Sequence, residues 1–415
     1  MSKVRELAVA ARQASRRLAT LDRAAKDTAL LAAAAALRAH KERVFIANRS
    51  DIEAARSSGL PEPMLDRLRM DDKVLEATAR GVEFIVSLPD PVGSRSDMHR
   101  LASGVLAGRE RIPLGVIAMV YESRPNVTVD AAALCLKAGN AVLLRGGKEA
   151  LHTNRVLGEI LQEALAGTRV PSQAVQIVPA SDREGIRELL SLDDLIDLAI
   201  PRGGEGLIRF VAENARVPVI KHYKGVCHLF LDVGSDPAMA ARLAVNGKVQ
   251  RPSACNALEC LLVHAADAER LLPPVTTALL AQGTELRGCA RTREIVPAAK
   301  PATDDDWGRE YLANILALRV VDDFEAALEH IARYGSNHTE SICTDSHHNA
   351  QRFLREVDAC CVLVNASTRF NDGAELGLGA EIGISTSKLH AYGPMGLESL
   401  TTQKWVVIGD GQIRG

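Results

Sequence analysis

Long apolar runs, paired cysteine motifs and a strong charge of either sign are all missing from this 415-residue chain. The longest alanine- and leucine-rich run, residues 29–37, is too short to cross a bilayer, and the first residues carry no apolar signal core. We therefore expect no membrane association. The net charge of −2 argues against nucleic acid as a main partner, because a phosphate backbone calls for a basic surface.

Cysteine spacing excludes two common kinds of site. No pair among the 8 cysteines has CxxC spacing, and no cysteine and histidine group has the spacing of a zinc motif. We therefore expect no resident metal. Eight cysteines without pairing patterns in a long chain fit a reducing compartment, which predicts a cytoplasmic protein.

What remains is an ordinary globular composition, with 47% hydrophobic and 25% charged residues. Residues 1–90 show the spacing of helices, and strands and helices alternate from about residue 115 onward. This rhythm predicts an α/β fold with a mostly parallel sheet covered by helices on both faces. In such sheets ligands bind at the carboxyl ends of the strands.

Cys255 is the most informative single residue. Six of the other cysteines lie in or beside apolar runs and are interpreted as core packing, and Cys289 gives no clear signal. Cys255 instead follows a polar, cationic segment and precedes the apolar run 257–263, which predicts a loop that leads into a buried strand. Lys248 and Arg251 nearby are expected to favour its thiolate, which would make it a nucleophile.

Two glycine turns follow predicted strands, at residues 144–148 and 200–206. Neither matches a dinucleotide or P-loop fingerprint, so a plain tight turn is the simpler interpretation of each one alone. Together they favour binding of a dinucleotide phosphate, because glycine lets backbone amides approach an anion and both turns carry cations. Among the histidines, only His222 lies among cations beside a predicted strand. It is either part of a surface loop or part of a site that binds a substrate anion.

Four segments together carry a family resemblance, and they span residues 121–128, 144–149, 250–256 and 379–386. They resemble the gamma-glutamyl phosphate reductases of proline biosynthesis, which belong to the aldehyde dehydrogenase superfamily, and the resemblance covers essentially the whole chain. It implies an aldehyde dehydrogenase-like fold, with a Rossmann-type cofactor domain, an α/β catalytic domain and a small β oligomerisation ribbon. The implied bounds are 1–236 with 356–395 for the cofactor domain, 237–355 for the catalytic domain, and 101–112 with 396–415 for the ribbon.

The resemblance assigns cofactor roles residue by residue. Arg145 falls where related enzymes hold the adenosine ribose, and Lys148 falls where members that prefer NAD often have glutamate. A cation at that position suits a 2′-phosphate, so NADPH is expected rather than NADH. Gly203 and Gly204 match the turn that faces the phosphates, and Glu310 matches the glutamate that orients the nicotinamide ribose.

Catalytic roles follow in the same way. Cys255 matches the catalytic thiol, and Asn126 is the candidate for the asparagine that holds the oxyanion. Hydrolytic members have a glutamate base where this chain has His222, and a base is needed to activate water against a thioester. The absence of that glutamate is consistent with a thioester whose acyl group is transferred to phosphate and not to water.

The implied reaction is the NADPH-dependent reduction of L-glutamyl 5-phosphate to L-glutamate 5-semialdehyde through a cysteine thioester. Some of five cationic residues are expected to bind the phosphoryl group or the α-carboxylate: Arg124, Lys221, His222, Arg251 and Arg369. The alternatives are another superfamily enzyme, either acylating or hydrolytic, and a catalytically silent member. A homo-oligomer is expected, and a complex with glutamate 5-kinase is a further hypothesis.

Overall fold

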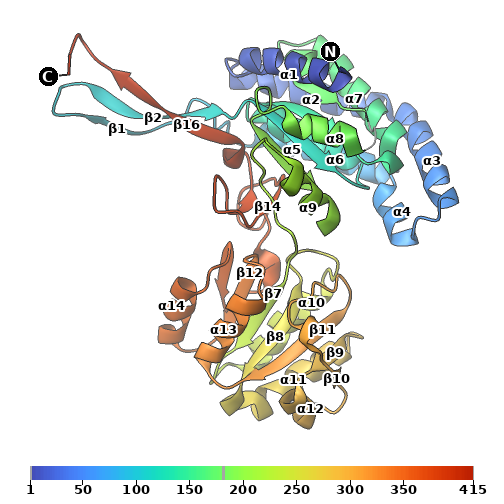
Figure 1. The fold of residues 1–415 in the computed structure, drawn as a ribbon, viewed down its shortest axis with the longest axis vertical. Coiled ribbons are helices and arrows are strands. Elements are labelled where there is room, and N and C mark those ends of the chain that lie inside the picture. Colours follow the sequence, from blue (N-terminus) through green and yellow to red (C-terminus); the bar gives the residue numbers. More distant parts are fainter. Residues whose placement is uncertain (1, 180–182, 415) are drawn as a thin grey trace. The chain divides into compact units, whose positions relative to one another are not determined.

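The computed structural model describes residues 2–179 and 183–414, and the chain forms two compact units (Figure 1). Unit 1 comprises Met1–Lys221, Leu378–Gly383 and Met395–Gly415. Unit 2 comprises His222–Gly377 and Ile384–Pro394. The chain therefore passes between the units several times.

Helices dominate the beginning of unit 1, as the spacing of its apolar residues predicts. The side chains of Ser2, Asp22 and Asp71 each accept a hydrogen bond from a backbone N–H three residues further on, which satisfies a free donor at a helix start. The helices of this unit are α1 (Lys3–Leu18), α2 (Arg23–Ala39), α3 (Lys41–Ser57), α4 (Glu62–Leu68), α5 (Asp72–Ser87), α6 (Asn126–Lys137), α7 (Leu151–Ala166), α8 (Arg183–Ser191) and α9 (Glu205–Asn214), with 3-10 turns η1 (Lys148–Ala150), η2 (Ser172–Ala174) and η6 (Glu398–Leu400).

A four-stranded parallel sheet lies in unit 1, in the order β5-β4-β3-β6. Helices α1, α6 and α7 contact its strands, and β3 and β4 are buried along their whole length, as expected for a sheet that is covered on both faces. The strands are β3 (Val116–Tyr121), β4 (Ala141–Arg145), β5 (Val175–Ile177) and β6 (Leu198–Arg202). The predicted alternation of strands and helices is confirmed here.

Unit 1 also carries a separate antiparallel sheet of three strands, in the order β1-β2-β16. The strands are β1 (Arg95–Arg100), β2 (Leu106–Pro113) and β16 (Thr401–Ile408). Trp405, Val407 and Ile408 of β16 are about half exposed or more, at 59%, 60% and 49%. The sheet therefore presents an apolar surface along its last strand.

A seven-stranded parallel sheet forms unit 2, in the order β10-β9-β11-β8-β7-β12-β13. Its strands are β7 (Cys227–Leu231), β8 (Leu258–His264), β9 (Glu285–Gly288), β10 (Lys300–Pro301), β11 (Ile315–Val321), β12 (Thr339–Cys343) and β13 (Cys361–Val364). The helices of this unit are α10 (Pro237–Val249), α11 (Ala268–Leu280), α12 (Ala290–Ile295), α13 (Phe324–Tyr334) and α14 (His347–Glu356), with 3-10 turns η3 (Ala265–Asp267), η4 (Asp304–Asp306) and η5 (Thr368–Phe370). Two short strands, β14 (Gly383–Ser385) and β15 (Gly393–Met395), pair where the chain passes between the units.

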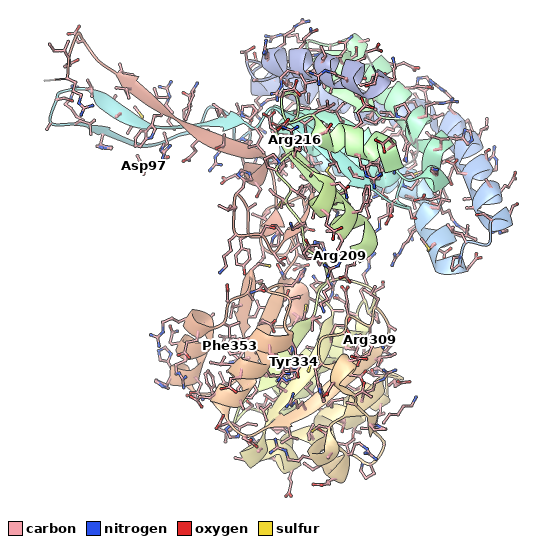
Figure 2. All side chains as sticks on the ribbon, viewed as in Figure 1. Asp97, Arg209, Arg216, Arg309, Tyr334 and Phe353 are labelled. Atoms are coloured by element: carbon pink, nitrogen blue, oxygen red, sulfur yellow. The ribbon has the colours of Figure 1, made fainter. Side chains whose placement is uncertain are left out.

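Two apolar cores cover the faces of this second sheet. Along β8, Leu261 and Val263 belong to the core that includes α10 and α11. Cys260 and Leu262 belong to the core that includes α13 and α14, where Phe353 is completely buried (Figure 2). Successive residues thus face opposite cores, which explains why the apolar run of β8 is continuous.

The bounds of the units differ from those that the resemblance implied. β7 pairs with β8 and β12, so residues 222–236 belong to the sheet of unit 2 and not to the cofactor domain. β13 pairs with β12, which keeps residues 356–377 in unit 2 as well. Within the described residues, no helix is long and apolar enough to span a membrane.

Candidate active site

Cys255 lies in the loop between α10 and β8, and its side chain is half-buried. The following residue, Asn256, is buried and donates from its amide to the backbone oxygen of Asn371 at 3.0 Å and more weakly to that of Arg369 at 3.4 Å. These bonds attach the cysteine loop to the segment around η5. The backbone of the thiol is therefore held from a distant part of the chain.

Gly225 holds the same loop from another side. A Cβ at this position would lie 1.8 Å from the backbone oxygen of Cys255, so only glycine allows this approach. The Gly225 N–H donates to Glu310 Oε1 at 3.0 Å, and the Cys227 thiol donates to the backbone oxygen of Cys255 at 3.3 Å. Glu310, expected to orient a ribose, therefore also positions the segment against which the cysteine loop packs.

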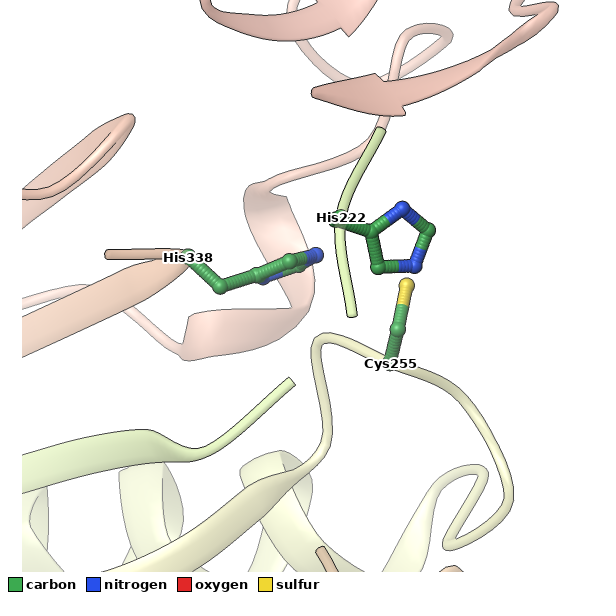
Figure 3. Close-up of side chains that lie close together, drawn as sticks. All are labelled: His222, Cys255 and His338. Atoms are coloured by element: carbon green, nitrogen blue, oxygen red, sulfur yellow. The ribbon is translucent and has the colours of Figure 1, made fainter. Parts of the chain in front are cut away.

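Two histidines lie beside the thiol (Figure 3). One ligand atom each from His222, Cys255 and His338 all lie within 4.8 Å of one another. The two imidazole rings meet edge to face with centroids 5.6 Å apart. His338 is buried, and its Nδ1 lies 2.7 Å from the hydroxyl oxygen of Thr339. Sequence reasoning singled out His222 and missed His338.

All three side chains precede neighbouring strands of the parallel sheet. His222 comes before β7, Cys255 before β8 and His338 before β12, and the order β8-β7-β12 makes these strands adjacent. The amino ends of parallel strands share one edge of a sheet, so these segments meet there. The expectation that ligands bind at the carboxyl ends does not describe the thiol cluster, which lies at the opposite edge.

Lys248 does not face the thiol as a free cation. Its ammonium forms an ion pair of 2.6 Å with Glu259 Oε2, and both side chains are completely buried. Burial raises the pKa of Glu259 to about 7 and lowers the pKa of Lys248. The pair joins the end of α10 to β8, so its function here is to brace the two elements on either side of the cysteine loop.

The candidate anion-binding residues divide between the two units. Arg251 and Arg369 lie in unit 2 with His222, where Arg251 is exposed and Arg369 donates from Nε to Gln250 Oε1 at 2.8 Å. Arg124 and Lys221 lie in unit 1. The structure thus brings three of the five candidates into the unit that carries the thiol.

The two glycine turns lie at the carboxyl ends of β4 and β6, on either side of β3 in the unit 1 sheet. Arg145 ends β4 and is buried, which lowers its pKa, although Glu149 and Glu122 oppose that shift. Lys148 begins η1 and is exposed. A cation that remains in solvent at this turn is available to a ligand.

Gly203 and Gly204 follow β6, and Gly204 is the N-cap of α9. The Gly204 N–H donates to Glu122 Oε2 at 3.0 Å, so an internal carboxylate lies at the amino end of this helix. Helix amino ends attract anions because their N–H groups and dipole both favour negative charge. A cofactor phosphate at this turn has to displace the carboxylate of Glu122, a residue that sequence reasoning did not single out.

Ser123 and Asn126 complete this side of unit 1. Ser123 has a left-handed φ of 47°, and Glu149 holds it by accepting from its N–H at 2.6 Å and from its hydroxyl at 3.0 Å. Asn126 is the first residue of α6 and donates to Asp130 Oδ2 at 2.9 Å, and burial raises the pKa of Asp130 to about 6. The amide of Asn126 is thus bonded within its own helix.

Known proteins agree with this combination of fold and thiol loop. The sequence model of the aldehyde dehydrogenase family matches residues 1–287, and the chain belongs to this family. Enzymes of this family use nicotinamide cofactors.

Within that family the similarity is to gamma-glutamyl phosphate reductases, which are oxidoreductases of proline biosynthesis. The chain is 61% identical to the Gamma-glutamyl phosphate reductase of Sorangium cellulosum, over 99% of this chain and 97% of that protein. It is 56% identical to the one of Meiothermus ruber, over 98% and 97%. The crystal structure of the Thermotoga maritima enzyme of that name superposes with a TM-score of 0.98 at 44% identity, covering 100% of both chains.

Proposed function

We propose that this protein reduces L-glutamyl 5-phosphate to L-glutamate 5-semialdehyde and phosphate, with NADPH as hydride donor and Cys255 as nucleophile. The observation that carries the proposal is the half-buried thiol of Cys255, in a loop fixed by Gly225 and Asn256, beside two imidazoles. The strong identity to proteins named gamma-glutamyl phosphate reductase supplies the substrate.

The first chemical step belongs to the thiol. Cys255 Sγ, as the thiolate, forms a bond with the acyl carbon, and the bond from that carbon to the phosphate oxygen breaks, which releases phosphate. His222 lies beside the sulfur and accepts the proton of the thiol. The backbone N–H of Cys255 is the donor in unit 2 that can stabilise the oxyanion. Asn126 is the candidate for a second donor, and its amide has to exchange Asp130 for the substrate to serve as one.

The residues at the glycine turns fit a dinucleotide. Gly204 places no side chain at the amino end of α9, so a phosphate there competes only with the Glu122 carboxylate that accepts from the Gly204 N–H. Arg145 and Lys148 add positive charge at the neighbouring turn, and the exposed Lys148 suits a 2′-phosphate. When bound, NADPH supplies the hydride that reduces the thioester, after which the thiohemiacetal carbon expels the Cys255 thiolate and leaves the aldehyde.

Cationic side chains bind the two anionic groups of the substrate. Arg251 and Arg369 are the candidates in unit 2, and Arg124 and Lys221 are the candidates in unit 1. His222 is the fifth candidate, but its position within 4.8 Å of the thiol favours a role in proton transfer. Glu310 combines two tasks in this scheme, because it fixes Gly225 and can accept from a ribose hydroxyl.

The reverse reaction provides the test. Purified protein is assayed for the oxidation of glutamate semialdehyde with phosphate, with coenzyme A and with neither, and with NADP against NAD. We expect turnover that requires phosphate and prefers NADP. Turnover without phosphate would indicate a hydrolytic enzyme, turnover that requires coenzyme A would indicate an acylating one, and no turnover on any of these would favour a catalytically silent member.

Cys255→Ser tests the nucleophile. We expect the variant to lose activity by several orders of magnitude while its thermal unfolding remains unchanged, because a half-buried Ser fills the same space without a thiolate. Cys289→Ser is the matched control, since Cys289 is also half-buried. Near-normal turnover of Cys255→Ser would exclude Cys255 as the nucleophile.

Self-association through the β1-β2-β16 sheet also belongs to the proposal. Trp405, Val407 and Ile408 give β16 an exposed apolar surface, which favours pairing with a second copy. We propose a homo-oligomer on this basis, and light scattering of Trp405→Glu tests it, since a charge at this position is expected to shift the protein toward the monomer. A complex with glutamate 5-kinase is a separate proposal, which co-purification with that kinase tests.

A further inference from the structure

The side chains around the thiol have the composition of a metal site as well as that of a nucleophile. Zinc prefers thiolate and imidazole ligands, and this cluster supplies one thiolate and two imidazoles. His222, Cys255 and His338 supply them from three neighbouring segments, with one ligand atom of each within 4.8 Å of the others. We propose that these three residues bind Zn²⁺ reversibly and that the bound ion blocks the nucleophile.

The distances suit zinc after a small rearrangement. Zinc binds sulfur at about 2.3 Å and histidine nitrogen at about 2.0–2.1 Å, so ligand atoms of a tetrahedral site lie roughly 3.3–3.6 Å apart. The atoms in this cluster, at 4.8 Å or less, need to approach by about 1 Å. Side-chain rotation of the half-buried His222 and Cys255 can supply this movement without displacing the backbone of the cysteine loop.

The surroundings of the cluster favour a defined geometry. The backbone at Cys255 is fixed by Gly225 and Asn256, so the loop that carries the sulfur is in place before any ion arrives. Nδ1 of His338 lies 2.7 Å from Thr339 Oγ1, and this hydroxyl is an outer partner of the kind that orients metal-binding histidines.

The exposed side of the cluster leaves room for a fourth ligand. Cys255 and His222 are both half-buried, so water or phosphate can complete the coordination from solvent. Three protein ligands and one open position describe a site that exchanges its metal, in contrast to the closed four-ligand sites that stabilise folds. Zinc at this place therefore competes directly with the substrate for the thiol.

A second group with the same ligand types lies in the core of unit 2, and it is not suited to zinc. His228, Cys260 and His330 are all buried, so an ion has no direct access. Arg319 Nη1 lies 3.0 Å from His330 Nδ1, and because a guanidinium only donates, the neutral His330 ring carries its proton on Nε2. That nitrogen has no lone pair for a metal, whereas it can donate to Cys260 Sγ at 3.7 Å.

Zinc binding can be measured without turnover, so its result is independent of the proposed function; only the inhibition rests on that function. Chelator-treated protein is titrated with Zn²⁺ against a chromophoric indicator, and Cd²⁺ reports thiolate coordination by its ultraviolet charge-transfer band. Alkylation of Cys255 by iodoacetamide, read by mass spectrometry, shows whether the ion covers the sulfur. We expect one equivalent of zinc, a cadmium–thiolate band and protection of Cys255.

Four variants separate the two clusters and the surface. Cys255→Ser and His338→Ala should each weaken zinc binding by at least about tenfold, since even outer partners of a metal site are worth about 10–100-fold in affinity. Cys260→Ser and His348→Ala, the latter an exposed histidine, should leave the affinity unchanged. Unaltered binding by Cys255→Ser, loss of binding in Cys260→Ser, or alkylation of Cys255 at the same rate with and without excess zinc would overturn the proposal.

In the active enzyme, zinc should abolish the phosphate-dependent oxidation, and EDTA should restore it. If the protein binds zinc at Cys255 but shows no reductase activity, the proposed function fails while the metal site stands. If the protein is active and zinc leaves both the alkylation of Cys255 and the activity unchanged, the metal site fails alone. Mg²⁺ is the control ion, because it prefers oxygen ligands and should have no effect.

Discussion

Gly225→Ala should inactivate the protein by moving the loop of the nucleophile. The added Cβ would lie 1.8 Å from the backbone oxygen of Cys255, 2.6 Å from its carbonyl carbon and 3.0 Å from its Cα. Non-bonded contacts settle near 3.5 Å, so the two segments have to separate by roughly 1.7 Å. A misplacement of about 1 Å can cost about 10²-fold in rate, and we expect a loss of at least that size in kcat.

The stability cost should be similar in size to the catalytic cost, since a 10²-fold loss of rate corresponds to about 2.7 kcal/mol, and the protein should still fold. Forcing an extra methyl group into a packed site costs about 1–3 kcal/mol, and Gly225 has no left-handed φ that would add backbone strain. The assay combines kcat for phosphate-dependent oxidation, the alkylation rate of Cys255 and the free energy of unfolding in urea. We expect a protein that folds but whose kcat and Cys255 alkylation rate both differ from those of the parent protein.

Gly81→Ala is the matched control for the same chemical change. Gly81 lies inside α5 with nothing within 4 Å of its potential Cβ, so alanine should raise the free energy of unfolding by about 0.5–1 kcal/mol and leave kcat unchanged. If Gly225→Ala instead retains the kcat, the alkylation rate and the stability of the parent protein, the close approach of the two segments is not required for the site, and the reasoning is refuted.

Three further predictions concern charge. Lys148→Glu should shift the ratio of kcat/KM for NADP over NAD toward NAD, and an unchanged ratio would exclude Lys148 from the 2′-phosphate site. Lys248→Met should lower the free energy of unfolding by about 3–5 kcal/mol because it leaves Glu259 buried and unpaired, while Lys248→Met with Glu259→Leu should recover most of that loss; strictly additive losses in urea denaturation would contradict the pairing. Burial lowers the pKa of His330 to about 2, whereas its value in the unfolded chain is about 6.5. Between these two pH values only the unfolded chain takes up the proton. The free energy of unfolding should therefore fall by about 1.4 kcal/mol for each unit that the pH is lowered below about 6.5. His330→Asn should flatten the acid side of the stability profile by that slope, and an identical slope would contradict the shift.

Local sequence patterns predicted the elements of the fold well. The helices expected over residues 1–90 are α1 to α5, and the apolar run after Cys255 is β8. These succeed because apolar periodicity and turn residues are local properties. The glycine turns also lie, as predicted, at the carboxyl ends of strands β4 and β6.

The residues that sequence reasoning missed depend on which strands are neighbours. His338 lies beside Cys255 only because β8, β7 and β12 are adjacent, an order that no local pattern contains. Glu122 reaches the turn at Gly204 for a similar reason, since β3 lies next to β6. His222, Cys255 and His338 each precede a buried strand. With the strand order known, this pattern would have indicated that they share one edge of the sheet.

The direction of a side chain was the other limit. Lys248 is close to Cys255 in sequence, and its charge predicted support for a thiolate. The last turn of α10 instead directs it into the interior, where Glu259 on β8 meets it. Whether a cation at a helix end faces solvent, a thiol or a carboxylate depends on how the helix is rotated against the sheet, and the sequence segment does not contain that rotation.

The pairing of β16 with β2 imposes an order on synthesis. Arg111 of β2 and Thr401 of β16 are joined by a hydrogen bond of 2.9 Å although they are 290 residues apart. On the ribosome, the strands of the second sheet, from β7 to β13, all emerge before β16 does, so unit 2 can fold while one edge of β2 still lacks its partner. An unpaired edge of this kind is a template for association with other chains, so the nascent protein presents a site for aggregation until β16 is made.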